Sequence, residues 1–193
     1  MTRDADDRYV IRCPRRAPGD PDGLVSARSL RHRQAVEQFA HYFRREFRYD
    51  FLHYEAGEGA GWDRASQPAE DEAAAYPFAS GCSYDGRYVG AACFRWRLYR
   101  DIPPRWALAW VWLHPYERRR GLLTLAWPVW VARHAPFAIE LPLSDAMETF
   151  VRRQGRCLAC WDRPLAAGQT MLCAECVKAL STGDTDKRLG DPA

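Results

Sequence analysis

Lysine is scarce in this chain of 193 residues: the lysines are Lys178 and Lys187, and the remaining permanently basic side chains are arginines. The formal net charge is +3, which by itself is too small to argue for nucleic-acid binding. The chain has no apolar run of about 18 residues or more, so we expect no membrane-spanning helix. Its acidic N-terminus lacks the apolar segment of a secretion signal. A cytoplasmic location is the resulting expectation.

The composition is rich in apolar residues, at 47%, and in aromatic residues, at 13%. This is enough for a packed core, and the length suits one ordinary domain with a small appendage. Tryptophans 106, 110 and 112 fall on one face of a predicted strand, with Ala107, Ala109 and Val111 on the other. Because both faces are apolar, we expect a central buried strand in which the tryptophans pack the core.

The most informative stretch is a predicted strand, turn and helix. An apolar strand over residues 106–113 leads into His114-Pro115, an arginine-rich turn ending at Gly121, and a helical run. Such a turn directs backbone N–H groups and the positive end of a helix toward an anion, usually a phosphate. A solvated surface turn is the alternative interpretation, since short motifs of this kind also occur without function.

The remaining pattern predicts an alternation of strands and helices. Strands are expected over residues 8–13, 78–84, 87–99, 106–113 and 137–141, and helices over residues 26–47, 119–133 and 144–153. Asp85-Gly86 predicts a hairpin turn, and Pro128 should bend the second helix. Residues 49–54 are a short strand or the helix exit, and residues 55–76 predict a mobile loop.

This element order, together with the arginine-rich turn, resembles the GNAT superfamily of N-acyltransferases over about residues 8–154. In that family the strand leads into an Arg/Gln-x-x-Gly-x-Gly/Ala turn that cradles the pyrophosphate of coenzyme A. Residues 118–123 fit the motif except at Leu123, and the two strands that usually follow the last helix are not evident. The resemblance implies an α/β fold with a mixed (α+β) sheet. It also implies coenzyme A contacts from Leu113, Arg118, Arg119, Arg120, Gly121, Leu122, Leu123 and Thr124.

Three residues are candidates for the chemistry of acyl transfer. Glu140 lies in an apolar strand beside the place where the family separates two strands, so it is the first candidate for a general base; a solvent-facing strand position is the alternative. His114 is a second candidate base, or a hydrogen-bonded residue at the end of a strand. Ser144 is a candidate thiolate donor, although helix capping also explains it. Phe150 stands where the family has a donor tyrosine.

Four cysteines near the C-terminus have the spacing of a zinc site. Cys157, Cys160, Cys173 and Cys176 form C-x2-C-x12-C-x2-C, which suits a structural Zn2+ with four thiolates. Two disulfides or four free thiols are the alternatives. The segment resembles a zinc ribbon or treble-clef knuckle. The expected division is therefore a GNAT-like domain over residues 1–154, a zinc-binding module over residues 155–181 and a disordered tail over residues 182–193.

Two functions follow as hypotheses. The first is transfer of an acetyl group from acetyl-CoA to an amine acceptor: a protein lysine, an N-terminal amine or a small amine. The second is a GNAT-like binding module that has lost catalysis and whose zinc knuckle contacts protein or nucleic acid.

The three isolated cysteines, Cys13, Cys82 and Cys93, are expected to be small buried residues.

Overall fold

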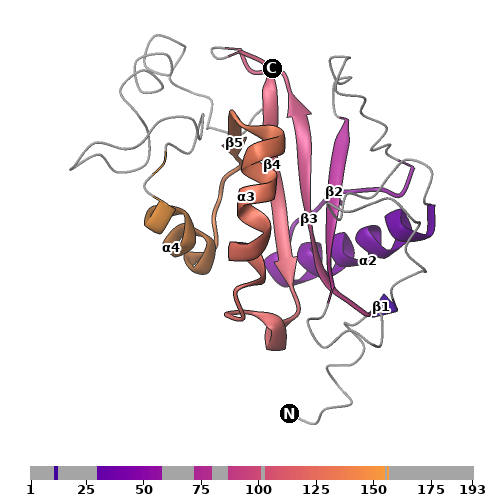
Figure 1. The fold of residues 1–193 in the computed structure, drawn as a ribbon. Helices are drawn as coiled ribbons and strands as arrows, with labels where there is room; N and C mark the ends of the chain where they lie inside the picture. The colour runs from indigo at the N-terminus through magenta and orange to yellow at the C-terminus, as the bar shows by residue number, and fades with distance from the viewer. Residues whose placement is uncertain are drawn as a thin grey trace.

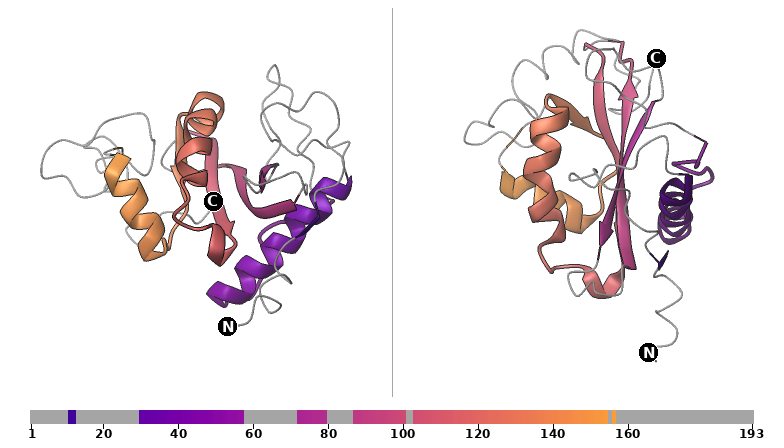
Figure 2. Two further views of the ribbon diagram at one scale, coloured as in Figure 1. Left: turned by 60° about the horizontal axis from the view of Figure 1, so that its bottom comes forward. Right: turned by 45° about the vertical axis from the view of Figure 1, so that its right-hand side comes forward.

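The computed structural model describes residues 11–12, 30–57, 72–79, 87–100, 103–154 and 156. These residues form a mixed α/β structure in which a central sheet lies between helices (Figure 1). Helix α2 covers one face of the sheet, and α3 and α4 cover the other (Figure 2). The bounds are β1 Ile11–Arg12, α2 Leu30–Phe47, β2 Ala73–Ala79, β3 Arg87–Arg97, β4 Arg105–Leu113, η3 Pro115–Glu117, α3 Leu122–His134, β5 Phe137–Ile139 and α4 Asp145–Gln154.

The sheet has five strands and mixed direction. The strands β1 and β2 both pair antiparallel with β3, and β3 pairs antiparallel with β4, which confirms the predicted meander. Helix α3 then carries the chain back so that β5 runs parallel to β4, as a crossover connection requires. Pairing of β5 covers only Trp106 to Leu108 of β4. The second half of β4 therefore continues past the end of β5.

Two apolar clusters hold the layers together. On one face, Val36, Phe39 and Phe43 of α2 recur at three- and four-residue spacing and pack against Trp110 and Trp112 of β4. On the other face, α3 buries Trp127 and Trp130 and α4 buries Val151 against β4 and β5. Pro128 lies inside α3 as expected, and the proline is exposed to solvent. All five of these β4 and α3 tryptophans, Trp106 included, are buried, which confirms that they pack the core.

A β-bulge corrects the predicted faces of β4. Cys93 pairs with Trp110 and Phe94 with Leu108, so Ala109 is an extra residue in β4. The bulge shifts the alternation by one position. Trp106 therefore packs in the cluster under α3 and α4, whereas Trp110 and Trp112 pack under α2. The prediction that the three tryptophans share one face was wrong.

Two predicted boundaries also need correction, and one open alternative is decided. The loop predicted over residues 55–76 is too long, because β2 already begins at Ala73 and its alanines are buried against β3. Residues 49–54 form no strand and are the exit of α2. The helix predicted from Arg119 starts at Leu122, because Arg119 and Gly121 have positive φ angles of 63° and 79°, which a right-handed helix excludes.

Gly90 of β3 explains why β3 and β4 approach closely at the end of β4. A Cβ atom at this position would overlap the carbonyl oxygen of Trp112. The predicted hairpin turn at Asp85-Gly86, Cys13, Cys82 and residues 157–193 lie outside the described residues. Cys93 is buried as expected. In the part of the chain that is described, no helix has both the length and the apolar character needed to cross a membrane.

Candidate functional site at the end of β4

The end of β4 presents a turn with an unusual backbone. His114 leaves the strand, residues 115–117 form one 3-10 turn, and residues 118–121 (the arginine turn) lead into α3. Gly121 occupies the N-cap of α3 in the left-handed region, with φ 79° and ψ 2°, and supplies no side-chain cap. The first N–H groups of a helix have no acceptor within the helix. With no side chain capping them, these groups of α3 suit an external anion.

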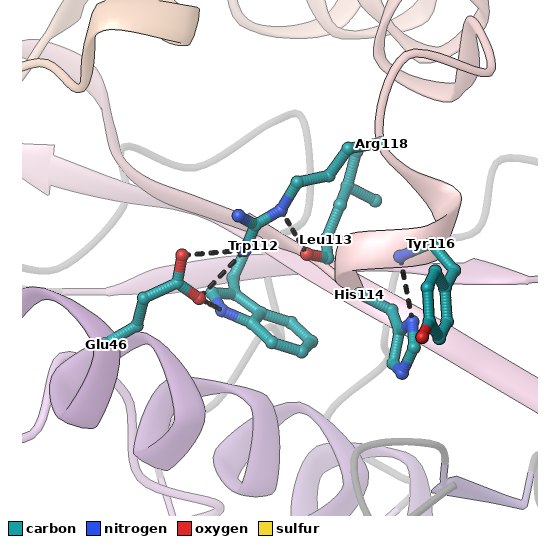
Figure 3. Close-up of polar contacts among 6 residues, drawn as sticks. All are labelled: Glu46, Trp112, Leu113, His114, Tyr116 and Arg118. Atoms are coloured by element: carbon teal, nitrogen blue, oxygen red, sulfur yellow. Dashed lines mark hydrogen bonds and ion pairs between the residues drawn. The ribbon is translucent and has the colours of Figure 1, made fainter. Parts of the chain in front are cut away.

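The three arginines of the turn have different surroundings. Arg118 points back toward the strand: its Nε donates to the carbonyl oxygen of Leu113 at 2.9 Å, and its Nη2 donates to Glu46 at 2.8 Å (Figure 3). Arg119 and Arg120 are exposed, and Arg120 pairs with Glu117 at 3.3 Å. All three arginines are exposed, but Arg118 is held by Glu46 at 2.8 Å and Arg120 by Glu117 at the longer distance of 3.3 Å.

The residues after Gly121 divide between core and surface. Leu122 and Leu123 pack against the cluster under α3, and Leu113 of β4 packs there too. Thr124 is exposed in the first turn of α3. Leu123, the departure from the family motif, thus has an inward position that accommodates its larger side chain.

The second half of β4 has an edge without a described strand partner. Beyond the paired residues Trp106 to Leu108, the Glu140 N–H donates a backbone hydrogen bond to the Leu108 carbonyl oxygen at 3.1 Å. The His114 N–H points the other way, to Val89 of β3 at 2.7 Å. Because backbone groups alternate along a strand, Val111 and Leu113 direct theirs away from β3. We call the N–H and carbonyl groups of Val111 and the N–H of Leu113 the open edge of β4, since Arg118 already holds the Leu113 carbonyl oxygen. This edge leads directly to the arginine turn.

Glu140 lies where β5 leaves β4, and its carboxylate is engaged. Arg97 of β3 donates from Nε to Glu140 Oε1 at 2.7 Å, and the two side chains are 16% and 14% exposed. Burial, reinforced by the negative charge of Glu140, raises the pKa of Tyr99 and of Tyr49. Glu140 is therefore not the solvent-facing residue of the alternative interpretation. Its carboxylate is also not free, because it is paired with Arg97.

The other two catalytic candidates have structural contacts. His114 is buried, and its Nδ1 accepts a hydrogen bond from the Tyr116 N–H at 3.2 Å (Figure 3). The Ser144 hydroxyl accepts from the Met147 N–H at 3.3 Å, and its carbonyl accepts from the Glu148 N–H at 2.8 Å. Ser144 therefore caps α4, which confirms the capping interpretation. Phe150 packs on Trp127 with ring centroids 4.8 Å apart.

Two residues near the site had no sequence signal. Glu46 of α2 accepts hydrogen bonds from Arg118 and Trp112, residues 72 and 66 positions away. Burial acts to raise the pKa of Glu46, but the hydrogen bonds from Arg118 and Trp112 and the charge of Arg118 outweigh it, so the pKa is lowered. Burial, with the nearby charges of Arg95 and Arg97, lowers the pKa of His53 to about 4.

The four cysteines predicted to bind zinc, Cys157, Cys160, Cys173 and Cys176, lie outside the described residues. Within the described ranges, no group of three or more histidine, cysteine, aspartate and glutamate side chains is placed to hold a metal ion. No protein family model matches the chain, and no curated protein sequence matches it.

Proposed function

We propose that this protein is a GNAT-like N-acetyltransferase that moves an acetyl group from acetyl-CoA to an amine. The observation that carries the proposal is the continuity between the open edge of β4 and the arginine turn. The open edge offers backbone hydrogen-bonding groups to an extended amide-containing chain, and the arginine turn offers N–H groups to a phosphate. Acetyl-CoA has both parts, joined in that order.

In this proposal the pantetheine amides bond to the backbone groups of Val111 and to the N–H of Leu113, whose carbonyl oxygen is held by Arg118. The pyrophosphate binds the N–H groups of the arginine turn and the start of α3. Arg119 and Arg120 add positive charge, and Leu122 to Thr124 form the first turn of the helix at the pyrophosphate. The acetyl group would then lie near the point where β5 leaves β4, beside Glu140.

The chemistry is direct transfer. The amine nitrogen attacks the thioester carbonyl, a C–N bond forms, the C–S bond breaks, and the thiolate leaves and takes up a proton. The amine loses one proton in the same process. Because Glu140 is held by Arg97, we assign to the chain mainly the positioning of the two reactants, which alone gives a large rate enhancement.

The test is calorimetric titration of the full chain with acetyl-CoA, followed by a screen of amine acceptors that measures release of free thiol. Binding in the micromolar range, about −8 kcal/mol, and acceptor-dependent thiol release support the proposal. Absence of acetyl-CoA binding refutes it.

A second candidate function is a GNAT-like module that binds without catalysis. It is favoured by the three catalytic candidates, since Glu140 pairs with Arg97, His114 bonds to the Tyr116 backbone, and Ser144 caps α4. This alternative predicts binding of acetyl-CoA or of another anion without thiol release above background for any amine. Its partner would be a protein or nucleic acid at the zinc knuckle.

A structural Zn2+ on Cys157, Cys160, Cys173 and Cys176 belongs to both functions. Four thiolates leave no position for water, so the metal would stabilise the module and not activate a substrate. Metal analysis should find about one zinc per chain, and Cys173→Ser should lose it while acetyl-CoA still binds. Full retention of zinc in that variant would refute the ligand set.

A further inference from the structure

Glu46 joins α2 to the arginine turn through two side-chain hydrogen bonds and to β4 through a third. Its carboxylate accepts from Trp112 Nε1 at 2.6 Å and, with both oxygens, from Arg118 Nη2 at 2.8 Å (Figure 3). The Arg118 guanidinium also lies 5.9 Å from the centre of the Trp112 ring. Its Nε meanwhile holds the Leu113 carbonyl oxygen. We call Glu46, Trp112, Arg118 and this carbonyl group the Glu46 anchor.

The anchor is attached to the strained part of the turn. Arg119, the next residue, has a φ of 63°, which is unfavourable for a side chain with a Cβ. Such a conformation persists only where the surroundings fix it. Arg118 is fixed on one side of Arg119, and on the other side Arg120 is paired with Glu117. The Glu46 side is the stronger constraint, because the two Arg118–Glu46 hydrogen bonds are 2.8 Å long against 3.3 and 3.4 Å between Arg120 and Glu117. Arg118 is also held by the Leu113 carbonyl oxygen.

The anchor also decides which arginine contacts a ligand. The Arg118 side chain is 40% exposed, but its guanidinium is occupied by Glu46 and by the Leu113 carbonyl oxygen. Its contribution to binding is therefore indirect. Arg119, Arg120 and the backbone N–H groups form the exposed side of the turn.

We propose that Glu46 is a positioning residue for the anion-binding turn: it holds Arg118, and thereby keeps Arg119 and the following N–H groups in the conformation that binds the pyrophosphate of acetyl-CoA. This rests on the proposed function for the identity of the ligand. The geometric part concerns the ligand-free protein alone.

The first experiment compares Glu46→Gln with Glu148→Gln. Glutamine keeps the size of the side chain and removes its charge. Glu148 is a matched control because it also pairs with an arginine, Arg152, but on α4. In ligand-free protein, amide hydrogen exchange over residues 118–124 should become about tenfold faster in Glu46→Gln and stay unchanged in the control. Acetyl-CoA affinity should fall about tenfold in Glu46→Gln only.

The second experiment separates positioning from general stability by changing Arg119 in the Glu46→Gln background. Arg119→Gly and Arg119→Ala both remove the charge, but glycine alone accepts the positive φ without strain. The glycine double variant should bind acetyl-CoA about fivefold more tightly than the alanine double variant, and should exchange its turn amides more slowly.

Unchanged exchange in Glu46→Gln overturns the proposal, and so does equal binding by the two double variants. Faster exchange in Glu46→Gln together with no acetyl-CoA binding by the wild type would support the positioning role and overturn the proposed function. The two parts therefore fail separately.

Discussion

The two halves of β4 differ in their strand neighbours within the described part of the chain. In the first half, Trp106 to Leu108 pair with β5 on one side and β3 on the other, and Glu140 and Arg97 form an ion pair beside them. In the second half, β3 remains but β5 is gone, and the strand leads into a turn with two positive φ angles. Both halves bury tryptophans in the core, but only the second half has an edge without a described strand partner, which the proposed function assigns to the ligand.

The bulge at Ala109 marks the division. It exchanges the faces of the strand, so that Trp106 packs under α3 while Trp110 and Trp112 pack under α2. The site residues predicted from the sequence fall on both sides of this division. Glu140 lies beside the paired half of β4, whereas Arg118 to Thr124 follow the half with the open edge. Substitutions on the two sides should therefore affect stability and binding differently.

The largest effect is expected for Gly121→Glu, in the open half. A side chain at φ 79° is strained, and its carboxylate would face the bound pyrophosphate. Acetyl-CoA affinity should fall about 100-fold or more, measured by calorimetry. Gly121→Asn is the control, because asparagine tolerates this backbone region and carries no charge; it should lose much less. Unchanged affinity in Gly121→Glu would show that the arginine turn does not bind the pyrophosphate.

Local signals predicted much of this half of the strand. The apolar run, the prolyl step and Gly121 together predicted a strand, a turn and a helix, because each depends on residues close in sequence. The capping role of Ser144 was open to the same reasoning, since its partner Met147 is three residues away.

Long-range packing explains what the sequence did not predict. Glu46 meets Arg118 across 72 positions, and no periodicity records such a contact. The bulge depends on the fit between β3 and β4, and alternation alone assumed a regular strand. Ala73 to Ala75 have weak strand propensity, yet burial against β3 makes them a strand.

The next largest effect is expected for Glu140→Gln, in the paired half. Removing one partner leaves the largely buried Arg97 guanidinium without its carboxylate, so the free energy of unfolding should fall by about 2 to 3 kcal/mol. Acetyl-CoA affinity should change less than about twofold. Urea denaturation of Glu140→Gln, Arg97→Gln and the double variant measures the coupling. Strictly additive effects of the two substitutions would contradict a stabilising pair.

Lower pH should destabilise the paired half through His134. This side chain is buried under Trp106, stacks on Phe94 and bonds through Nε2 to the Tyr76 hydroxyl at 2.6 Å. Burial, with the charge of Arg133, lowers its pKa to about 3 in the folded state. The unfolded state takes up the proton below its ordinary pKa of 6.5, so stability falls as pH drops from 6.5 toward 3. The loss from His134 should be roughly 2 kcal/mol by pH 5.

Denaturation curves at pH 7 and pH 5, with NMR titration of the folded protein, check this. The His134 ring signals should not shift between pH 7 and pH 5. A titration midpoint near 6.5 for the folded protein would show that the ring reaches solvent and would contradict its place in the core.

The smallest effect is expected for Ser144→Ala, which tests whether a residue outside both halves takes part in the chemistry. The hydroxyl caps α4 through the Met147 N–H, and loss of such a cap costs about 1 kcal/mol. Ser144→Asp should restore the stability, since aspartate caps a helix as well as serine does. Acetyl-CoA affinity and any thiol release should be the same in all three proteins. A rate at least tenfold lower in both variants, with Ser144→Asp as stable as the wild type, would instead show that the hydroxyl serves the thiolate.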